Sequence, residues 1–228
     1  MHSRNPFTPP RRILASLGGE RILKKYSEFP NFTLFSGDKI PKIGMGCWKI
    51  PKNISSDKIY EAIKIGYRHI DEACDYGNEK EVGLGIQKAI RENIVTRDEL
   101  WITSKLWNTY HDPVNVEKAC RKSLDDLGLD YLDLYLIHFP ISLRYVPFDV
   151  RYPPEWVYDP KSSNQKLEID HIPIHKTWGA MEVLCDKGLV RNIGLCNFNV
   201  CLIRDILSYC KIPPSVLQIE LHPYNQQE

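Results

Sequence analysis

The sequence has almost no excess charge and no long apolar run. Its 228 residues include 30 Lys and Arg and 29 Asp and Glu, which leaves a formal net charge of +1. A chain this close to neutrality does not present the basic surface that attracts nucleic acid or an anionic membrane. No uninterrupted apolar stretch approaches the roughly 18 residues of a transmembrane helix. We therefore expect neither nucleic acid nor a membrane as a partner.

Two other patterns are missing. The seven cysteines are odd in number and none stands in a Cys-x-x-Cys pair, which favours reduced thiols in an intracellular, cytoplasmic protein. No Gly-x-Gly-x-x-Gly turn occurs, because Gly44-x-Gly46 lacks a third glycine and Gly83-x-Gly85 lies inside a predicted helix. A Rossmann dinucleotide-binding domain is therefore disfavoured.

The first thirty residues differ in composition from the rest. They contain several basic residues, have no acid before Glu20, and are rich in proline at the start. Organellar presequences share this character, and a disordered leader has it equally. We favour a basic, disordered leader over residues 1–30, followed by one domain over residues 31–228.

From Asn31 onward, strand and helix signals alternate. Residues 31–43 predict a hairpin around Gly37, and residues 55–57 predict the cap of a first helix. Strands are predicted to start near residues 43, 67, 100, 132, 190 and 216. Helices are predicted over residues 58–65, 79–92, 114–127, 174–187 and 200–210. The spacing of the strands is typical of βαβ units and predicts a parallel sheet.

A long stretch over residues 141–172 interrupts this regularity. It is rich in proline and in tyrosine, phenylalanine and tryptophan. A long loop in a compact domain is usually a functional lid or a pocket wall. We predict a pocket wall, with a packed surface excursion as the alternative.

Three of the predicted strands end on chemically reactive side chains. Asp71 ends the second strand and is followed by Tyr76, Lys105 ends the third, and His138 ends the fourth. The carboxyl ends of neighbouring parallel strands lie together in α/β enzymes. We therefore predict that these four side chains form one proton-transfer site.

Reduction of a carbonyl would use each of the four groups. A tyrosine has an ordinary pKa near 10, and an adjacent ammonium favours its phenolate. Tyr76 would supply the proton, Lys105 would assist it, and Asp71 would position Lys105. His138 would hydrogen-bond the carbonyl oxygen. Taken singly, each residue also has a structural interpretation as packing, a solvated lysine or a core histidine.

A metal hydrolase is a poorer alternative. It would use His69, His111, His138 and Asp71, but no His-x-x-x-His spacing occurs and Lys105 would repel a cation. We therefore predict no metal site.

Several longer motifs resemble the aldo-keto reductase family. They are Gly46–Lys49, Asp71–Glu79, Ser104–Asn108, Leu132–Pro140 and Leu217–Tyr224. Through Tyr145–Phe148 and Tyr152–Trp156, the chain is most similar to the aldose and D-xylose reductase branch. The resemblance covers about residues 31–228.

The resemblance implies an α/β fold of the TIM-type (β/α)8 barrel, here incomplete, with the hairpin and about six of the eight βα units. By motif, Tyr76 is the general acid, Lys105 and Asp71 tune it, and His138 orients the carbonyl. The implied cofactor is NADPH, with NADH as an alternative, and the implied substrate is a small aldehyde or sugar. The implied cofactor-binding residues are Asp71, Cys196, Asn197 and Gln218. The implied substrate-binding residues are Trp48, Trp107, His138 and Phe139. We expect a monomer or a weak dimer.

The sequence departs from the family pattern at two places. Cys196 stands where the family usually has serine, and a thiol is a weaker hydrogen-bond donor than a hydroxyl. The chain stops at Glu228, just past the sixth strand, whereas the family's later nicotinamide-stacking tyrosine and phosphate-binding segment lie beyond that point. The expected function is NADPH-dependent reduction of aldehydes and aldoses. The alternative is a catalytically inactive barrel fragment or a partner-binding remnant.

Overall fold

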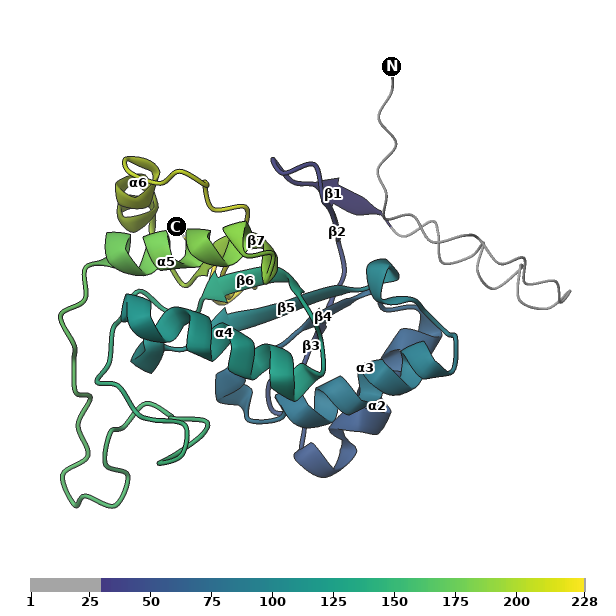
Figure 1. Cartoon of the computed structure of the whole chain (residues 1–228), viewed down its shortest axis with the longest axis horizontal. Coiled ribbons are helices and arrows are strands. Elements are labelled where there is room, and N and C mark those ends of the chain that lie inside the picture. Colours follow the sequence, from purple (N-terminus) through teal and green to yellow (C-terminus); the bar gives the residue numbers. More distant parts are fainter. Residues whose placement is uncertain (1–29, 228) are drawn as a thin grey trace, which may run out of the picture. The chain divides into compact units, whose positions relative to one another are not determined.

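The structure is a computed structural model that describes residues 30–227 (Figure 1). The predicted leader over residues 1–30 lies, apart from Pro30, outside the described residues, so the division into leader and barrel domain stays a prediction. A short hairpin comes first, with β1 (Asn31–Thr33) antiparallel to β2 (Lys39–Pro41). Gly37 makes the turn at a φ of 90°, a conformation that glycine adopts without steric cost. The predicted hairpin is confirmed.

A single parallel sheet forms the centre of the described chain. Its strands are β3 (Met45–Gly46), β4 (His69–Asp71), β5 (Trp101–Leu106), β6 (Leu132–Ile137), β7 (Val190–Cys196) and β8 (Leu217–Gln218). They are hydrogen-bonded in sequence order, β3-β4-β5-β6-β7-β8. This order has no reversal point of the Rossmann type and is the order of a barrel wall. The predicted incomplete barrel is confirmed.

The two outermost strands are shorter than predicted. The prediction of strands over residues 43–48 and 216–221 is wrong in length, because β3 and β8 contain two residues each. Within residues 30–227, each of these strands pairs with a neighbour on one side only. Strands β5 and β6 each pair with a neighbour on both sides and are buried along their whole length. This burial explains their nearly continuous apolar sequences.

Helices follow the strands and cover the sheet. They are α2 (Lys52–Ile65), α3 (Glu79–Arg91), α4 (Pro113–Leu127), α5 (Ile174–Asp186) and α6 (Val200–Leu207). Short 3-10 turns are η1 (Cys74–Tyr76), η2 (Arg97–Glu99) and η3 (Asn108–Tyr110). Successive helices contact one another along the outside of the sheet (Figure 1). One cluster of buried apolar side chains therefore lies between strands and helices.

Two predicted helix ends are wrong. The first helix, α2, begins at Lys52 after Pro51 rather than at a cap over residues 55–57. Ser55 is instead fully buried inside α2, where its hydroxyl donates to the Pro51 carbonyl at 3.0 Å. The last helix, α6, ends at Leu207 instead of Cys210, with the Ser208 hydroxyl donating to the Asp205 carbonyl at 2.6 Å.

The second Gly-x-Gly pair serves helix packing. A Cβ added to Gly83 of α3 would lie 2.5 Å from the Leu127 carbonyl oxygen, and one added to Gly85 would lie 2.5 Å from the Ser56 carbonyl oxygen. These glycines let α3 approach the backbones of α4 and α2 more closely than any other residue would. The interpretation against a dinucleotide-binding turn holds for this pair, which lies inside a helix.

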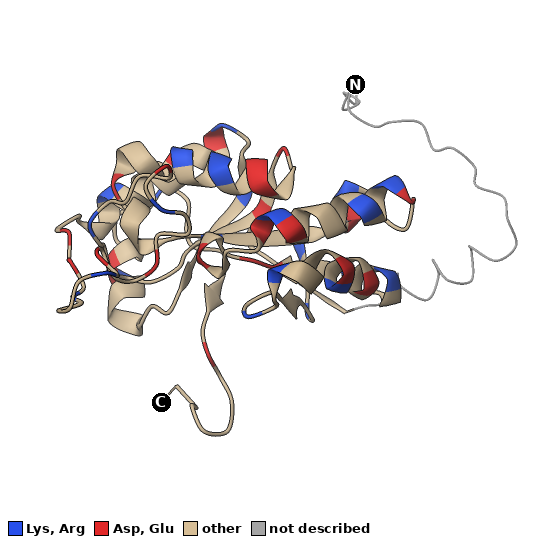
Figure 2. Cartoon of the chain, turned by 90° about the horizontal axis from the view of Figure 1, so that it is seen from below, with Lys and Arg blue, Asp and Glu red and all other residues tan. Residues whose placement is uncertain are grey.

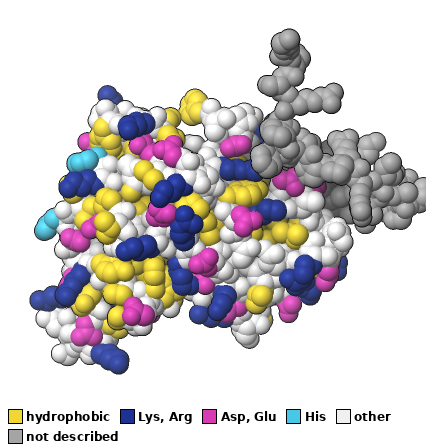
Figure 3. Space-filling view, viewed as in Figure 1, with side chains coloured by type: hydrophobic (Ala, Val, Ile, Leu, Met, Phe, Trp, Pro, Cys, Tyr) yellow, Lys and Arg dark blue, Asp and Glu magenta, His cyan; other side chains and the backbone are white. Residues whose placement is uncertain are grey.

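The described surface carries both signs of charge. Lys, Arg, Asp and Glu alternate along the helices in Figure 2, and the face in Figure 3 mixes them with apolar side chains. None of the helices in residues 30–227 is long and apolar enough to cross a bilayer. All seven cysteines are free thiols.

Candidate active site

The four predicted catalytic residues lie at one end of the sheet. Asp71 is the last residue of β4, Lys105 lies near the end of β5, and His138 directly follows β6. Tyr76 ends η1, the 3-10 turn that follows β4. Because β4, β5 and β6 are adjacent and parallel, their carboxyl ends bring these side chains together.

The Lys105 ammonium is the centre of the group. Nζ donates to Asp71 Oδ1 at 2.6 Å, to Tyr76 Oη at 2.9 Å and to the Glu72 carbonyl at 3.0 Å. An ammonium has three hydrogens, so each has an acceptor and the group is held in one orientation. The Lys105 side chain has no exposed surface. The predicted contact between a buried cation and the phenol is present.

Burial changes the pKa values of this pair in a way the sequence did not predict. Burial is the largest influence on Tyr76 and outweighs the Lys105 ammonium, so the pKa of Tyr76 rises to about 12. For Lys105, burial lowers the pKa, but Asp71 and Tyr76 more than offset it, and the pKa lies above its ordinary value. At neutral pH the pair is therefore a protonated phenol next to an ammonium, not a phenolate.

His138 faces Tyr76 as a neutral ring. The two ring centroids are 5.8 Å apart, with the planes at 79°. Burial, assisted by the Lys105 charge, lowers the pKa of His138 to about 3. Among residues 30–227, no group hydrogen-bonds the buried Nδ1 of His138. Because Nδ1 has almost no exposed surface, Nε2 is the nitrogen of this neutral imidazole that can accept a hydrogen bond from a bound molecule or donate one to it.

Aromatic rings line the space beside His138. Phe139 stacks on the His138 ring at 4.9 Å, and Trp107 meets the same ring edge-on at 5.2 Å. Trp156 packs against both Trp107 and Phe139 at 4.9 Å. Trp48 is 64% exposed, and no ring contact in the described part of the chain joins it to this cluster. The structure therefore brings Trp107 and Phe139 next to His138, and the role of Trp48, which follows β3 by two residues, stays a prediction.

Trp156 was missed as a site residue by the sequence analysis. The signals were its place in the aromatic stretch over residues 141–172 and in the Tyr152–Trp156 motif, neither of which indicated which ring would face the site. Its contacts with Trp107 and Phe139 identify it.

The four predicted cofactor-binding residues also lie together. Gln218 Nε2 donates to Asp71 Oδ2 at 2.6 Å, and the Cys196 thiol lies 3.7 Å from Gln218 Oε1. Asn197 Nδ2 donates to the His138 carbonyl at 2.9 Å. Two side-chain amides next to a carboxylate offer both donors and acceptors, which fits a ligand carboxamide. Burial raises the pKa of the Cys196 thiol to about 11, so it stays protonated and can donate weakly.

Two buried carboxyl groups lie near the site, and no pattern in the sequence predicted their roles. Glu79 accepts hydrogen bonds from Ser104 at 2.7 Å and from Ser123 and Tyr152 at 3.1 Å. Glu72 is fully buried, and within residues 30–227 the weakly donating thiol of Cys47 is the one side chain that interacts with its carboxyl as a hydrogen-bonding partner. Burial, with a smaller contribution from Glu79, raises the pKa of Glu72 well above its ordinary value. Burial therefore favours the protonated form of Glu72.

The histidines of the metal alternative each have their own contacts. His69 Nε2 contacts Thr103 Oγ1 at 3.0 Å, and His111 Nδ1 contacts Ser142 Oγ at 3.0 Å. Within the described residues, no three His, Cys, Asp or Glu side chains are placed to hold a metal ion. The geometry gives the metal hydrolase no support.

Comparison with known proteins finds relatives that are similar in sequence. The chain is 53% identical over 207 residues to the probable NAD(P)H-dependent D-xylose reductase of Arthroderma otae, covering 89% of this chain and 62% of the relative. It is 53% identical over 198 residues to the NADPH-dependent aldose reductase of Saccharomyces cerevisiae, covering 86% and 60%. The chain thus spans about 60% of the length of these curated relatives.

Two solved structures are also similar to this chain. The aldose reductase of Schistosoma japonicum superposes with a TM-score of 0.78 at 42% identity, over 85% of this chain and 61% of that one. A Bombyx mori aldo-keto reductase, solved in complex with NADP, has a TM-score of 0.75 at 39% identity, over 87% and 60%. A sequence model described as the aldo/keto reductase family matches residues 42–228, which is most of the chain. The chain belongs to the aldo/keto reductase family.

Proposed function

We propose that this protein reduces the carbonyl group of aldehydes, including aldoses, to alcohols, with NADPH as the hydride source and Tyr76 as the proton donor. The observation that carries the proposal is the hydrogen bond from Lys105 Nζ to Tyr76 Oη at 2.9 Å, opposite the ring of His138. It joins an acid to a group that stabilises the conjugate base of that acid.

The direction of this hydrogen bond determines where the Tyr76 proton is available. Because Lys105 donates to Oη, the phenol's own hydrogen is not used in that contact and can be given to a substrate oxygen. When Tyr76 gives up this proton, the phenolate lies beside an ammonium that is already in place. The negative charge is thereby stabilised without rearrangement of the site.

Asp71 and His138 have supporting roles. Asp71 accepts from Lys105 at 2.6 Å and keeps the ammonium charged and oriented. His138 is neutral at ordinary pH, because its pKa is about 3. A neutral imidazole N–H donates to a carbonyl oxygen without adding a second positive charge next to Lys105.

The proposed cofactor residues are Asp71, Cys196, Asn197 and Gln218. Their amide and carboxylate groups fit a nicotinamide carboxamide at the mouth of the site. When bound, NADPH supplies the hydride. The relatives are named as NAD(P)H- or NADPH-dependent reductases, which supports NADPH, with NADH as the alternative.

The proposed substrate is a small aldehyde or aldose. Trp107, Phe139 and Trp156 offer an apolar wall next to His138, and the relatives named as xylose and aldose reductases support this class. The cytoplasmic location, the monomeric or weakly dimeric state and the contact of Trp48 with substrate stay predictions.

The test is an assay of aldehyde-dependent NADPH oxidation by the purified protein, with glyceraldehyde and xylose as substrates. Wild-type protein is expected to oxidise NADPH, and Tyr76→Phe is expected to lose about 10²–10⁴-fold in kcat/KM. NADPH binding, followed by fluorescence quenching, should be the same in both proteins. Turnover by Tyr76→Phe at the wild-type rate would exclude Tyr76 as the donor. Absence of NADPH binding and turnover in the wild type would favour the inactive remnant.

A further inference from the structure

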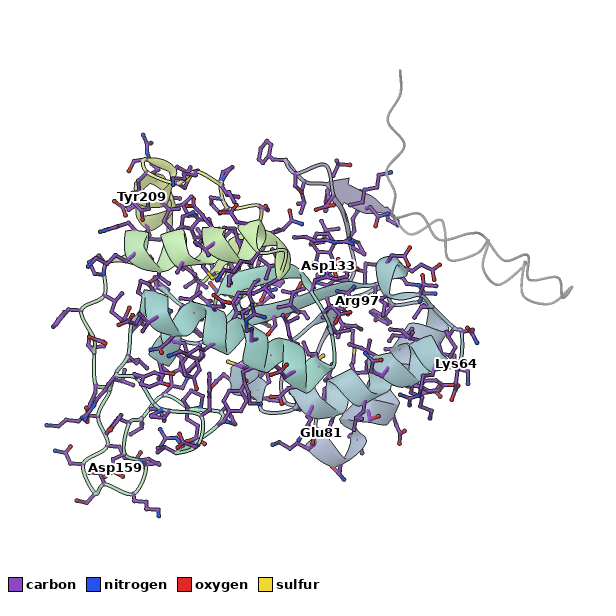
Figure 4. All side chains as sticks on the ribbon, viewed as in Figure 1. Lys64, Glu81, Arg97, Asp133, Asp159 and Tyr209 are labelled. Carbon is purple, nitrogen blue, oxygen red and sulfur yellow. The ribbon has the colours of Figure 1, made fainter. Side chains whose placement is uncertain are left out.

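The segment between β6 and α5 has no regular secondary structure to hold its shape. Apart from an isolated bridge between Leu143 and Ile169, its backbone contains neither helix nor strand. It extends from the sheet as the long excursion in Figure 1, and Figure 4 places Asp159 far out along it. We call residues 147–158 of this segment, which carry Trp156, the pocket loop. A loop without ladder hydrogen bonds needs other partners to present one ring at a fixed place.

Arg151 supplies such partners inside the pocket loop. Its Nε and Nη2 donate to the Pro154 carbonyl at 2.9 and 2.6 Å. Nη2 also donates to the Val157 carbonyl at 2.6 Å, and Nη1 donates to the Tyr158 carbonyl at 3.1 Å. Within residues 30–227, no carboxylate forms an ion pair with Arg151. The guanidinium therefore serves the carbonyl groups of its own loop.

These contacts bracket Trp156. The carbonyl groups fixed by Arg151 belong to residues two positions before Trp156 and one and two positions after it. Between them, the Glu155 carbonyl accepts from Trp107 Nε1 at 3.1 Å. Hydrogen bonds from a charged donor are roughly twice as strong as neutral ones, so the backbone on both sides of Trp156 is held.

Tyr152 ties the pocket loop to the barrel. Its hydroxyl donates to Glu79 Oε2 at 3.1 Å, and Ser104 donates to Glu79 Oε1 at 2.7 Å. Ser104 directly precedes Lys105 on β5. The Lys122 ammonium lies 4.4 Å from the centre of the Tyr152 ring. The loop is thus attached to Glu79 of α3, and Glu79 in turn is hydrogen-bonded to the strand that carries Lys105.

We propose that Arg151 and Tyr152 are positioning residues for substrate binding, with Arg151 setting the shape of the pocket loop and Tyr152 setting its place on the barrel. Together they hold Trp156 as a rigid pocket wall. This inference rests on the proposed reductase function and deepens it, because it identifies which part of the substrate the wall contacts.

The ring contacts indicate which part of the substrate Trp156 contacts. Trp156 touches Trp107 and Phe139, and these two rings, not Trp156, touch His138. A substrate whose carbonyl oxygen lies at His138 reaches Trp156 only with atoms remote from the carbonyl. A larger aldehyde, such as an aromatic one, should therefore depend on the wall, whereas glyceraldehyde should not.

The first experiment measures the loop without using activity. Chymotrypsin cleaves after the aromatic residues of the pocket loop only when the loop opens. We expect Arg151→Met to be cleaved within residues 145–158 about tenfold faster than wild type, with Arg151→Lys in between, because a lysine keeps the charge but not the planar fork. Tyr152→Phe, which removes one oxygen atom, should be cleaved about threefold faster.

The matched control is Lys166→Met. Lys166 belongs to the same segment but is exposed, and its ammonium forms no ion pair with any of residues 30–227. It should be cleaved at the wild-type rate. Far-UV circular dichroism confirms that each variant is folded, and the mild Tyr152→Phe change keeps the test valid if Arg151→Met does not fold. Wild-type cleavage rates in Arg151→Lys and Tyr152→Phe would overturn the proposal.

The second experiment separates binding from chemistry. In Arg151→Met, KM for an aromatic aldehyde is expected to rise about tenfold, with kcat within about threefold of wild type. KM for glyceraldehyde should stay within about twofold. Equal losses for both aldehydes, or a loss confined to kcat, would overturn the positioning role. Inactivity of the wild type would instead contradict the proposed reductase function, and the cleavage rates would still decide whether Arg151 and Tyr152 hold the loop.

Discussion

The two ends of the sheet each contain a buried ion pair, and the pairs differ in their partners. At the carboxyl end, Lys105 contacts Asp71 at 2.6 Å, with side chains 0% and 16% exposed. At the amino end, Arg97 contacts Asp133 at 2.8 Å, with side chains 18% and 3% exposed. Figure 4 shows Arg97 and Asp133 close together at the far end of the strands. Burial alone therefore does not distinguish the two.

The partners do. Arg97 also donates to the carbonyl groups of Leu100 at 2.9 Å and Tyr131 at 2.8 Å, and Asp133 accepts from the Ile102 backbone N–H at 2.9 Å. Arg191 Nη1 also lies 3.5 Å from Asp133 Oδ1. Neither the backbone groups nor a guanidinium changes its protonation near neutral pH. Lys105, by contrast, holds the phenol of Tyr76, which can lose a proton. The comparison teaches that a buried ion pair closed by backbone groups stabilises the fold, whereas one that includes a titratable hydroxyl can serve chemistry.

Lys105→Met should break the carboxyl-end pair with the largest effect. It removes the hydrogen bond to Tyr76 Oη and the positive charge that stabilises phenolate. We expect kcat/KM for glyceraldehyde to fall by about 10³–10⁴-fold, which corresponds to about 4–5.5 kcal/mol of transition-state stabilisation. Steady-state NADPH oxidation measures the fall in kcat/KM, and thermal unfolding checks that the variant is folded. Activity within threefold of wild type in a folded variant would contradict the assignment of Lys105.

Arg97→Met should break the amino-end pair and affect stability. Burial, opposed by Arg97, already raises the pKa of Asp133. Removal of Arg97 leaves the buried carboxylate with Arg191 as its cationic partner, at 3.5 Å and with a side chain that is 47% exposed. We expect a loss of about 2–4 kcal/mol in the free energy of unfolding, somewhat less than for a fully unpaired buried charge, measured by urea denaturation. The loss should be larger at pH 8 than at pH 5, because a raised pKa lets low pH neutralise the carboxylate.

The control for this variant is Arg144→Met, which removes an exposed ion pair and should cost no more than about 1 kcal/mol. Equal losses in the two variants would mean that the buried position of Asp133 does not matter.

His138→Gln should lower activity with little change in stability. It removes the proposed imidazole hydrogen bond to the substrate oxygen, and we expect kcat/KM to fall by about 10²–10³-fold, or about 3–4 kcal/mol. Because the pKa of His138 is about 3, the pH profile of wild-type kcat/KM should show no change of slope caused by titration of this residue between pH 5 and 9. A bend near pH 6.5 that disappears in His138→Gln would show that the ring titrates, contrary to this prediction.

Glu72→Gln should have the smallest effect, on the pH dependence of stability. The pKa of Glu72 is raised in the folded protein, chiefly by burial, so folding retains a proton that the unfolded chain releases. The contribution of Glu72 to the free energy of unfolding is fully present below the pKa that Glu72 has in the unfolded chain. It declines as pH rises above that value, by at most about 1.4 kcal/mol per pH unit. The variant should show a shallower decline between pH 5 and 8 in urea denaturation.

Glu61→Gln is the matched control, because Glu61 is exposed in an i,i+3 pair with Lys64. It should leave the wild-type slope unchanged. A slope in Glu72→Gln equal to that of wild type would show that Glu72 is ionised in the folded protein.

The positions of reactive residues at the ends of predicted strands indicated the site, which none of these residues would have indicated alone. Asp71, Lys105 and His138 each end a recognisable apolar strand, and parallel strands in sequence order bring such ends together. The same reasoning did not reach Arg151, whose hydrogen bonds go to carbonyl groups of residues with no common pattern. Nor did it reach Glu72, which stands in a polar stretch and is nevertheless fully buried.

Local sequence by itself determined the order of strands and helices, the glycine turns, and the alignment of reactive side chains at the strand ends. These features depend on neighbours a few residues apart and on the regular geometry of strand and helix. Only the tertiary structure decided the protonation states, since burial raises the pKa of Tyr76 despite the adjacent ammonium. It also decided which ring of the long loop faces the site and where the edge strands end. Solvation and packing are set by residues distant in sequence, and no local pattern contains them.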